Sequence, residues 1–311
     1  MKWQKMGRVF VPDGRQAWAT KHAFPPTPYF LKDGTLRLYV AFCDDNTVGR
    51  LGYVDVDPTN PSRVLGVADR PLLDVGAPGA FDENGVVPTS IVTVGDALYL
   101  YYVGFQLGQK VRYYQFQGLA ISRDGGQSFT RASRVPILDR SDKEMLNRTS
   151  GFVLKEDGVF KLWYVGGSEW TVVHGKPLPI YSIKYLESPN GINWPTEGRP
   201  AINFKDEDEH ALGRPYVLRD GPLYRMWYSI RSRSLGYRLG YAESLDGKSW
   251  VRKDDEVGID VAADGWDSQM VGYPAVVQHQ GKTYLFYNGN SCGQTGFGYA
   301  VLESWSNKAA A

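Results

Sequence analysis

One strand pattern recurs five times along the chain, and this recurrence limits the fold more than any other feature. In residues 98–104, Leu-Tyr-Leu-Tyr-Tyr-Val-Gly, large apolar and aromatic side chains alternate at the period of two that is typical of a packed β-strand. The pattern recurs at 36–41, 160–166, 224–229 and 283–289. Each copy contains an equivalent tyrosine: Tyr39, Tyr102, Tyr164, Tyr228 and Tyr287. Successive tyrosines are 59 to 64 residues apart, so five similar units fill the chain.

The composition indicates that these units are built from β-strands. Aromatic residues make up 14% of the 311 residues, and 35 glycines and 18 prolines accompany them. Aromatic side chains favour strands, whereas glycine and proline favour the turns between strands. Each unit divides into a first strand, the aromatic strand, a third strand and an outer strand. An Asp-Gly or Asn-Gly turn and a bulky aromatic residue, as in residues 244–250, separate the last two strands.

The fifth unit has no outer strand of its own, because the chain ends soon after the third strand at 298–301. The N-terminal residues 3–10 resemble the outer strand that begins at Trp250 in the fourth unit, so we expect them to complete the fifth. This pairing closes the ring and leaves no exposed sheet edge. The sequence therefore predicts an all-β fold, a five-bladed β-propeller with four-stranded antiparallel blades that is closed by the N-terminal strand.

A single domain is expected over residues 1–308, because no linker divides the chain. The expected blades cover the approximate ranges 15–75, 80–140, 144–203, 209–260, and 267–304 together with 3–10. The final alanines, 309–311, are set aside as an added tail.

Charge and cysteine content exclude several classes of function. A net charge of +1 provides no basic surface for nucleic acid or for an anionic membrane. The two cysteines, Cys43 and Cys292, are too few for a disulfide framework or a cysteine-based metal site, and no other metal or cofactor motif occurs. No apolar run has the length of a signal peptide or a membrane span. We expect a cytoplasmic protein without metal or cofactor that binds a small molecule.

The ligand sites of a propeller gather at the mouth of its central channel, where loops from all blades converge. In this sequence the loops before the first strands and after the aromatic strands carry carboxylates, cations and amides, with aromatic residues between them. Each residue alone is more simply explained as part of a solvated loop or a tie between blades, so the convergence is the functional signal. The expected substrate-binding residues are His22, Asn84, Arg148, Trp170, His210, Arg214, Arg231, Asp267, Tyr273, Asn288 and Asn290.

The repeated motifs carry a family resemblance that covers essentially the whole chain. First strands begin with prolines such as Pro215 and Pro274, aromatic strands end in Tyr-x-Gly, and residues 241–250 read Tyr-Ala-Glu-Ser-Leu-Asp-Gly-Lys-Ser-Trp. In these features the chain resembles the five-bladed propellers of the arabinanase, levansucrase and invertase superfamily of glycoside hydrolases. The resemblance implies cleavage of a glycosidic bond by a pair of carboxyl groups, one protonated and one ionised.

The acids that the resemblance implies are not present at the corresponding positions. They would stand beside the first-strand prolines of blades 1 to 3, where this chain has Thr27, Ser90 and Thr149 or Ser150, so it is a divergent member. Other acids lie a few residues upstream. If the protein is catalytic, we expect Asp82 or Glu83 to act as the base or nucleophile and Glu144 or Glu209 to act as the acid.

The sequence leaves two main functions open. The first is an enzyme that hydrolyses or transfers a glycosyl group, by phosphorolysis among other routes, which the dense polar loops favour. The second is a non-catalytic sugar-binding propeller, which the missing family acids favour. A protein-interaction scaffold is a third alternative. The many arginines suit an anionic ligand, such as a sugar phosphate, a nucleotide sugar or an acidic sugar.

Overall fold

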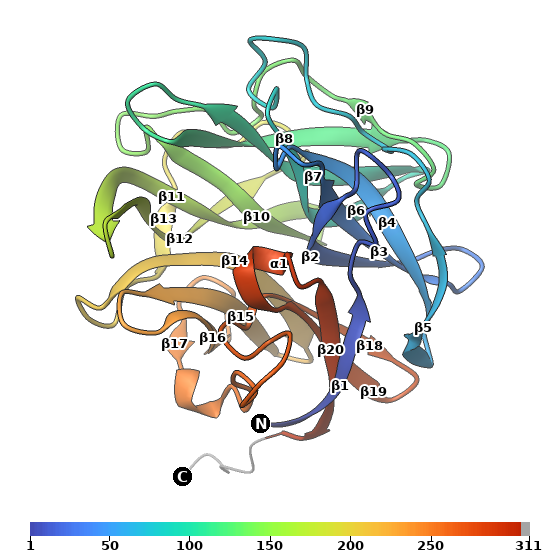
Figure 1. The fold of residues 1–311 in the computed structure, drawn as a ribbon. Helices are drawn as coiled ribbons and strands as arrows, with labels where there is room; N and C mark the ends of the chain where they lie inside the picture. Colours follow the sequence, from blue (N-terminus) through green and yellow to red (C-terminus); the bar gives the residue numbers. More distant parts are fainter. Residues whose placement is uncertain (306–311) are drawn as a thin grey trace.

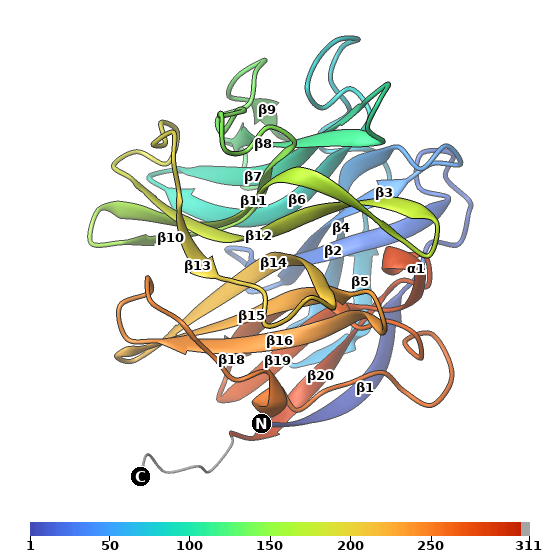
Figure 2. The ribbon, with the colours of Figure 1, turned by 90° about the vertical axis from the view of Figure 1, so that its left-hand side faces the viewer.

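The computed structural model describes residues 1–305 as a nearly all-β molecule. Its strands follow one another around a central axis in chain order, from blue through green to red in Figure 1, and Figure 2 shows the same strands from the side. The predicted all-β propeller is confirmed. Residues 306–311, which include the terminal alanines and the end of the expected domain, lie outside the described residues.

Antiparallel pairing groups the strands into five sets of four, and short parallel pairings join the second, third and fourth sets into one continuous sheet. Blade 1 consists of β2 (Lys21–Phe30), β3 (Leu36–Cys43), β4 (Gly49–Asp57) and β5 (Asn60–Val67). Blade 2 consists of β6 (Val86–Val94), β7 (Ala97–Leu107), β8 (Tyr113–Ser122) and β9 (Thr130–Arg131). Blade 3 consists of β10 (Asn147–Glu156), β11 (Val159–Val173), β12 (Lys176–Ser188) and β13 (Arg199–Ile202). Blade 4 consists of β14 (Glu209–Asp220), β15 (Leu223–Ser232), β16 (Gly236–Ser244) and β17 (Val251–Arg252). Blade 5 consists of β18 (Gly272–His279), β19 (Lys282–Asn288), β20 (Phe297–Ser304) and β1 (Lys2–Phe10).

Helical structure is confined to two short segments of the described chain. A 3₁₀ turn covers Asp254–Glu256, and α1 (Asn290–Gly293) follows the aromatic strand of blade 5. Within residues 1–305, no helix has the length and apolar character needed to cross a lipid bilayer.

The N-terminal strand closes the ring, as expected from the sequence. Strand β1 pairs antiparallel with β20, from Lys2 opposite Ser304 to Phe10 opposite Phe297. The buried side chain of Trp3 secures this closure because its indole nitrogen donates to the carbonyl oxygen of Val257 at 2.9 Å.

A hydrogen bond from an aromatic strand to a turn of the next blade recurs at the three junctions from blade 1 to blade 4. The Tyr39 hydroxyl of blade 1 donates to the Gly126 carbonyl of blade 2 at 3.2 Å. The Tyr101 hydroxyl of blade 2 donates in the same way to Gly191 of blade 3 at 2.9 Å. The Trp163 indole of blade 3 donates to Gly247 of blade 4 at 2.8 Å. The aromatic side chains therefore fill the space between blades and also fix the position of the following blade.

The accepting turns have the geometry that their sequences predict. In blade 3, the side-chain oxygen of Asn190 accepts hydrogen bonds from the backbone of Ile192 and Asn193 at 3.0 and 2.9 Å. Gly191 has a φ of +70°, and a Cβ atom there would lie 2.5 Å from the Tyr101 hydroxyl. Glycine is therefore required both by the turn and by the close approach of the neighbouring blade.

We predict that Tyr101→Phe lowers the free energy of unfolding by about 1–2 kcal/mol, because the buried Gly191 carbonyl loses its hydrogen-bond donor. Urea unfolding measures this change. The matched control is Tyr99→Phe on the same strand, since the half-buried Tyr99 makes no such inter-blade bond. Equal midpoints for the two variants would show that the inter-blade bond adds no stability.

Candidate functional site

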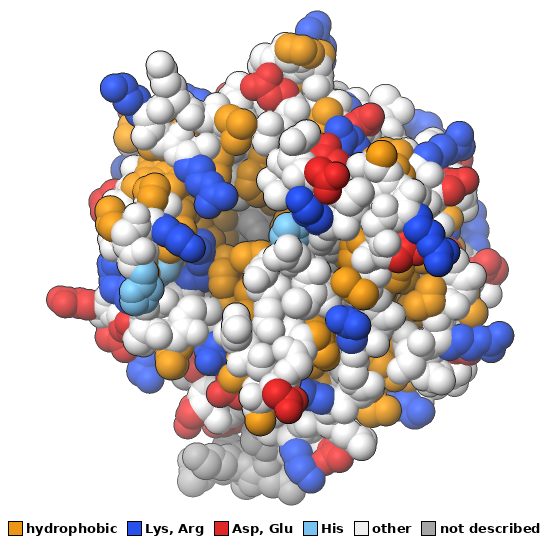
Figure 3. Space-filling model, in the orientation of Figure 1, with side chains coloured by type: hydrophobic (Ala, Val, Ile, Leu, Met, Phe, Trp, Pro, Cys, Tyr) orange, Lys and Arg blue, Asp and Glu red, His pale blue; other side chains and the backbone are white. Residues whose placement is uncertain are grey.

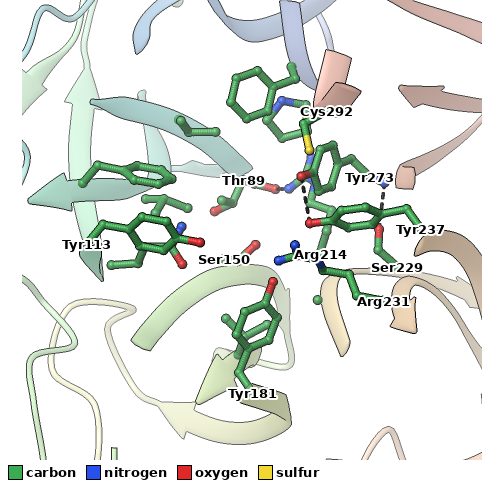
Figure 4. Close-up of a pocket in the computed structure, with 18 of the residues that line it drawn as sticks. Thr89, Tyr113, Ser150, Tyr181, Arg214, Ser229, Arg231, Tyr237, Tyr273 and Cys292 are labelled. Atoms are coloured by element: carbon green, nitrogen blue, oxygen red, sulfur yellow. Dashed lines mark hydrogen bonds between the residues drawn. The ribbon is translucent and has the colours of Figure 1, made fainter. Parts of the chain in front are cut away.

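A pocket of about 290 Å³ lies at the centre of the ring, lined by residues from all five blades. The face shown in Figure 3 is hollowed near its centre, and hydrophobic, lysine and arginine side chains surround the hollow. Figure 4 shows the pocket-lining side chains that converge from different strands. The pocket is therefore a product of the ring as a whole and not of one blade.

Each innermost strand has a bulge at the same point, where its pairing with the aromatic strand shifts. The first residue of each bulge lines the pocket: Pro25, Thr89, Ser150, Arg214 and Tyr273. Ser150, Arg214 and Tyr273 have φ angles of 53°, 51° and 56°, in the left-handed region that is costly for residues other than glycine. The bulge turns these side chains towards the channel.

The bulge determines which residues of the first strands face the channel. Alignment on the first-strand prolines pointed to Thr27 and Ser90, whereas Pro25 and Thr89 are the channel-facing residues of blades 1 and 2. In blade 3 the channel-facing residue is Ser150, one of the two expected alternatives. None of these channel-facing residues has a carboxyl group.

Arg214 forms a buried cationic centre in the pocket. Its guanidinium donates to the backbone oxygen of Thr89, to that of Pro26 at 3.1 Å and to the Thr27 hydroxyl at 2.9 Å. Arg214 is only 2% exposed, its Nε has no partner, and no carboxylate of residues 1–305 forms an ion pair with it. Burial lowers the pKa of Arg214 to about 10, so the side chain remains charged at neutral pH. A buried charge without a counter-charge is costly, and an anion would relieve that cost.

A second cation and two phenols form the adjoining wall, contributed by blades 4 and 5. The Arg231 guanidinium lies 4.8 Å from the centroid of the Tyr237 ring. The Tyr273 hydroxyl donates to the Tyr237 hydroxyl at 3.2 Å, and Ser229 accepts a hydrogen bond from the Tyr273 backbone at 2.8 Å. Burial raises the pKa of both tyrosines, so they remain neutral hydrogen-bonding groups at physiological pH.

Carboxylates are absent from the pocket lining within residues 1–305. The charged lining residues are Arg112, Arg214 and Arg231, and the hydroxyl groups come from Thr89, Ser150, Ser229 and the tyrosines. This set can bind an anion through charge-assisted hydrogen bonds and can stack a flat apolar surface. It cannot place two carboxyl groups on either side of a glycosidic bond.

Two of the expected catalytic acids lie inside their own blades. Asp82 is fully buried, accepts from the Tyr102 hydroxyl at 2.9 Å and pairs with Arg131 at 2.7 Å. Glu144 is also buried, and its carboxylate accepts from the Tyr164 hydroxyl at 3.0 Å. Arg148 and Lys184 each pair with Glu144 at 2.6 Å.

The other two acids also have protein partners. Glu209 pairs with Arg252 at 2.6 Å, and Glu83 accepts from the Gln106 amide at 3.4 Å. Asp267, an expected ligand-binding residue, pairs with Lys5 at 2.7 Å and accepts from the blade 5 aromatic-strand tyrosine. A tyrosine–carboxylate–cation arrangement thus recurs within the blades. The five acids named here and in the preceding paragraph do not line the pocket.

The structure brings some of the expected ligand-binding residues to the pocket. Arg214, Arg231 and Tyr273 line it directly. Three more of them lie close to lining residues. The Trp170 ring is 5.3 Å from that of Tyr113, and the His22 ring is 5.9 Å from that of Phe24. The His210 ring contacts the Pro179 carbonyl near Arg231.

The remaining expected residues support the surrounding loops. Arg148 is held by Glu144. Asn288 donates to the Ala23 carbonyl at 2.8 Å, and Asn290 accepts from the Gln269 backbone at 2.8 Å. Asn84 contributes a backbone hydrogen bond to its own blade. These four do not line the pocket.

Three tyrosines that line the pocket, Tyr113, Tyr181 and Tyr237, were not expected from the sequence. They come from β8, β12 and β16, the third strands of blades 2, 3 and 4. The recurrence of tyrosine in third strands is a signal that is present in the repeat, with Tyr113 and Tyr237 at the start of their strands and Tyr181 in the middle of β12. It lies outside the loops before the first strands and after the aromatic strands, from which the candidates were drawn.

We predict that Asp82→Asn lowers the free energy of unfolding by about 3 kcal/mol, because Arg131 loses its buried counter-charge. The neighbouring substitution Glu83→Gln serves as the control, with an expected change below about 1 kcal/mol because Glu83 is only half-buried. Chemical denaturation of both variants measures the difference. Unchanged stability of the Asp82 variant would contradict a structural role for this ion pair.

A pH dependence is expected from His210. Burial and the nearby Arg231 lower the pKa of His210 below its usual 6.5. The unfolded chain therefore binds a proton more readily than the native protein, and stability falls as the pH drops below about 6.5. Burial and Lys21 lower the pKa of His22 in the same direction.

The measurement is the free energy of unfolding at several pH values between 7.5 and 5.5. We predict that the free energy of unfolding declines less with falling pH in the His210→Gln variant than in the wild type. The His174→Gln variant, altered at an exposed hairpin turn, should show the same decline as the wild type. An identical pH profile for wild type and the His210 variant would refute this assignment.

Several solved structures share the fold. They include a glycoside hydrolase with a TM-score of 0.71 and 17% identity over 99% of this protein and 95% of the hydrolase. A thermostable family-43 glycoside hydrolase has a TM-score of 0.69 and 16% identity over 95% and 91% of the two proteins. A member of the GH130 family of mannoside phosphorylases and glycoside hydrolases has a TM-score of 0.71 and 16% identity over 99% and 95%. At these identities the likeness concerns the fold.

No known protein-family model matches the sequence. Curated relatives include two proteins from strains of Mycobacterium tuberculosis. "Uncharacterized protein Rv1502" is 36% identical over 304 residues, which cover 98% of this protein and all of the relative. "Uncharacterized protein MT1551" is 35% identical over the same length and coverage. With this identity over nearly its whole length, the protein belongs to the same family as Rv1502 of Mycobacterium tuberculosis.

Proposed function

We propose that this protein binds a small carbohydrate with an anionic group in the central pocket. The observation that carries the proposal is the fully buried Arg214, which has no carboxylate partner among the described residues and lies in a pocket whose lining contains no acid. Bound phosphate or carboxylate would supply the missing negative charge.

The aromatic lining suits the rest of such a ligand. Tyr113, Tyr181 and Tyr237 offer ring faces and hydroxyl groups, which together can contact the apolar face and the hydroxyls of a sugar. A volume of about 290 Å³ favours one sugar ring over an oligosaccharide or an enclosed nucleotide sugar. The fold shared with carbohydrate-active enzymes supports a carbohydrate ligand, although fold alone does not determine function.

Recognition without catalysis is the alternative that the geometry supports best. Asp82, Glu144 and Glu209 would each have to leave a buried ion pair before acting on a ligand in the pocket. Glycosyl hydrolysis or transfer is the second candidate. It is favoured by the strained backbone at Ser150, Arg214 and Tyr273, since strain of this kind clusters at active sites and ligand clamps.

We predict that sugar phosphates or uronic acids raise the melting temperature of the protein and that the neutral parent sugars do not. A ligand at 100 times its dissociation constant adds about 2.7 kcal/mol of stability. The substitution Arg231→Gln should weaken binding about 10- to 100-fold, because a charge-assisted hydrogen bond is lost. Thermal unfolding and calorimetric titration provide the measurements.

The control is Arg219→Gln, which removes the same charge at an exposed position remote from the pocket lining. The proposal fails if no anionic sugar binds, or if both arginine variants lose affinity equally. Incubation of the wild-type protein with glycosides of the ligands that bind, with and without inorganic phosphate, distinguishes recognition from turnover.

A further inference from the structure

The central pocket has two chemically different walls. Arg214, Arg231, Tyr237 and Tyr273 come from blades 4 and 5, and Figure 4 shows Arg231, Tyr237 and Tyr273 on one side with Tyr113 opposite them. The other blades contribute a set of apolar side chains that is defined here as the apolar wall: Phe24, Val87, Val103, Phe105 and Val165. Blades 4 and 5 thus supply two of the three lining arginines, whereas blades 1 to 3 supply the apolar wall and, beside it, polar groups such as Arg112, Tyr113 and Ser150.

Four of the five residues of the apolar wall pack together, and Val165 is not part of their cluster. Val87 of β6 and Val103 of β7 are opposite each other in the strand pairing, and they pack with Ala41, Phe24 and Phe105 in one cluster. Both valines are at most 6% exposed. A ligand hydroxyl directed at these side chains would lose its water partners and gain none, whereas a methyl group or a bare ring carbon would be buried favourably.

We propose that the ligand is an anionic monosaccharide in which a hydroxyl opposite the anionic group is absent or capped, as in a deoxy or O-methyl sugar. This inference rests on the proposed function and narrows it to one class of ligand. The anionic group lies against Arg214 and Arg231, and the deoxy or methylated position lies against the apolar wall. Removing the mismatched hydroxyl improves affinity about tenfold, within the usual effect of a single group in a hydrophobic pocket.

Matched ligand pairs test this inference on the wild-type protein. The probes are glucose 1-phosphate, galactose 1-phosphate, glucuronate and galacturonate, each beside its monodeoxy and mono-O-methyl derivatives, with affinities from calorimetric titration. The phosphate and uronate series show which anionic group is preferred. We expect at least one derivative in the preferred series to bind about tenfold more tightly than its fully hydroxylated parent.

A variant of the apolar wall provides a second measurement. Val103→Thr keeps the size of the side chain and adds a hydroxyl, so it should reduce or reverse the preference for the derivative. The matched control is Val172→Thr, at an exposed position 67% accessible to solvent, which should keep the wild-type preference. Circular dichroism spectra and cooperative thermal unfolding like those of the wild type verify that both variants fold.

The outcomes separate the two proposals. If the parent sugars bind as tightly as every derivative, or more tightly, the apolar-wall inference is overturned and the proposed function stands. An unchanged preference in the Val103 variant also overturns the inference. If no anionic sugar binds in any form, the proposed function fails and the inference fails with it.

Discussion

The hydrogen bond from an aromatic strand to the turn of the next blade is the interaction that fixes blades 1 to 4 relative to one another. Apart from the bonds that Arg214 makes across the channel, the contacts between blades join neighbours, so the position of each blade is set locally. Tyr39, Tyr101 and Trp163 provide this local setting in blades 1 to 3, and each donates to a glycine carbonyl in the following blade. Small errors in the positions of successive blades would add up around the ring and would change the shape of the central pocket, to which all five blades contribute.

Charge is distributed differently in the blades and in the channel. Within the blades, carboxylates such as Asp82 and Glu144 are matched by cations and by tyrosine hydroxyls. In the channel, Arg214 is buried among backbone carbonyls and a threonine hydroxyl. The blades therefore pair these carboxylates with cations, whereas the central pocket contains an arginine without a carboxylate partner among the described residues.

The repeat in the sequence was sufficient to predict the propeller and its closure by residues 3–10, because strand period and unit length are local properties of the chain. The site was only partly predictable. Arg214, Arg231 and Tyr273 line the pocket as expected. For polar loop residues such as Asp82, however, the sequence does not distinguish a side chain that faces the channel from one that is buried within its blade. The bulge also moved the channel-facing position of blade 2 to Thr89, and a bulge leaves no reliable mark in a single sequence.

The repeated bulge gives the ring five equivalent channel-facing positions, one in each blade. Because the same backbone irregularity presents one side chain per blade, each of Pro25, Thr89, Ser150, Arg214 and Tyr273 occupies a separate sector of the channel. A substitution at Pro25, Thr89 or Ser150 alters the chemistry of one sector, whereas the side chains of Arg214 and Tyr273 also form hydrogen bonds to other blades. The ring can therefore acquire a new ligand preference one sector at a time, which makes the channel an adaptable part of a rigid molecule.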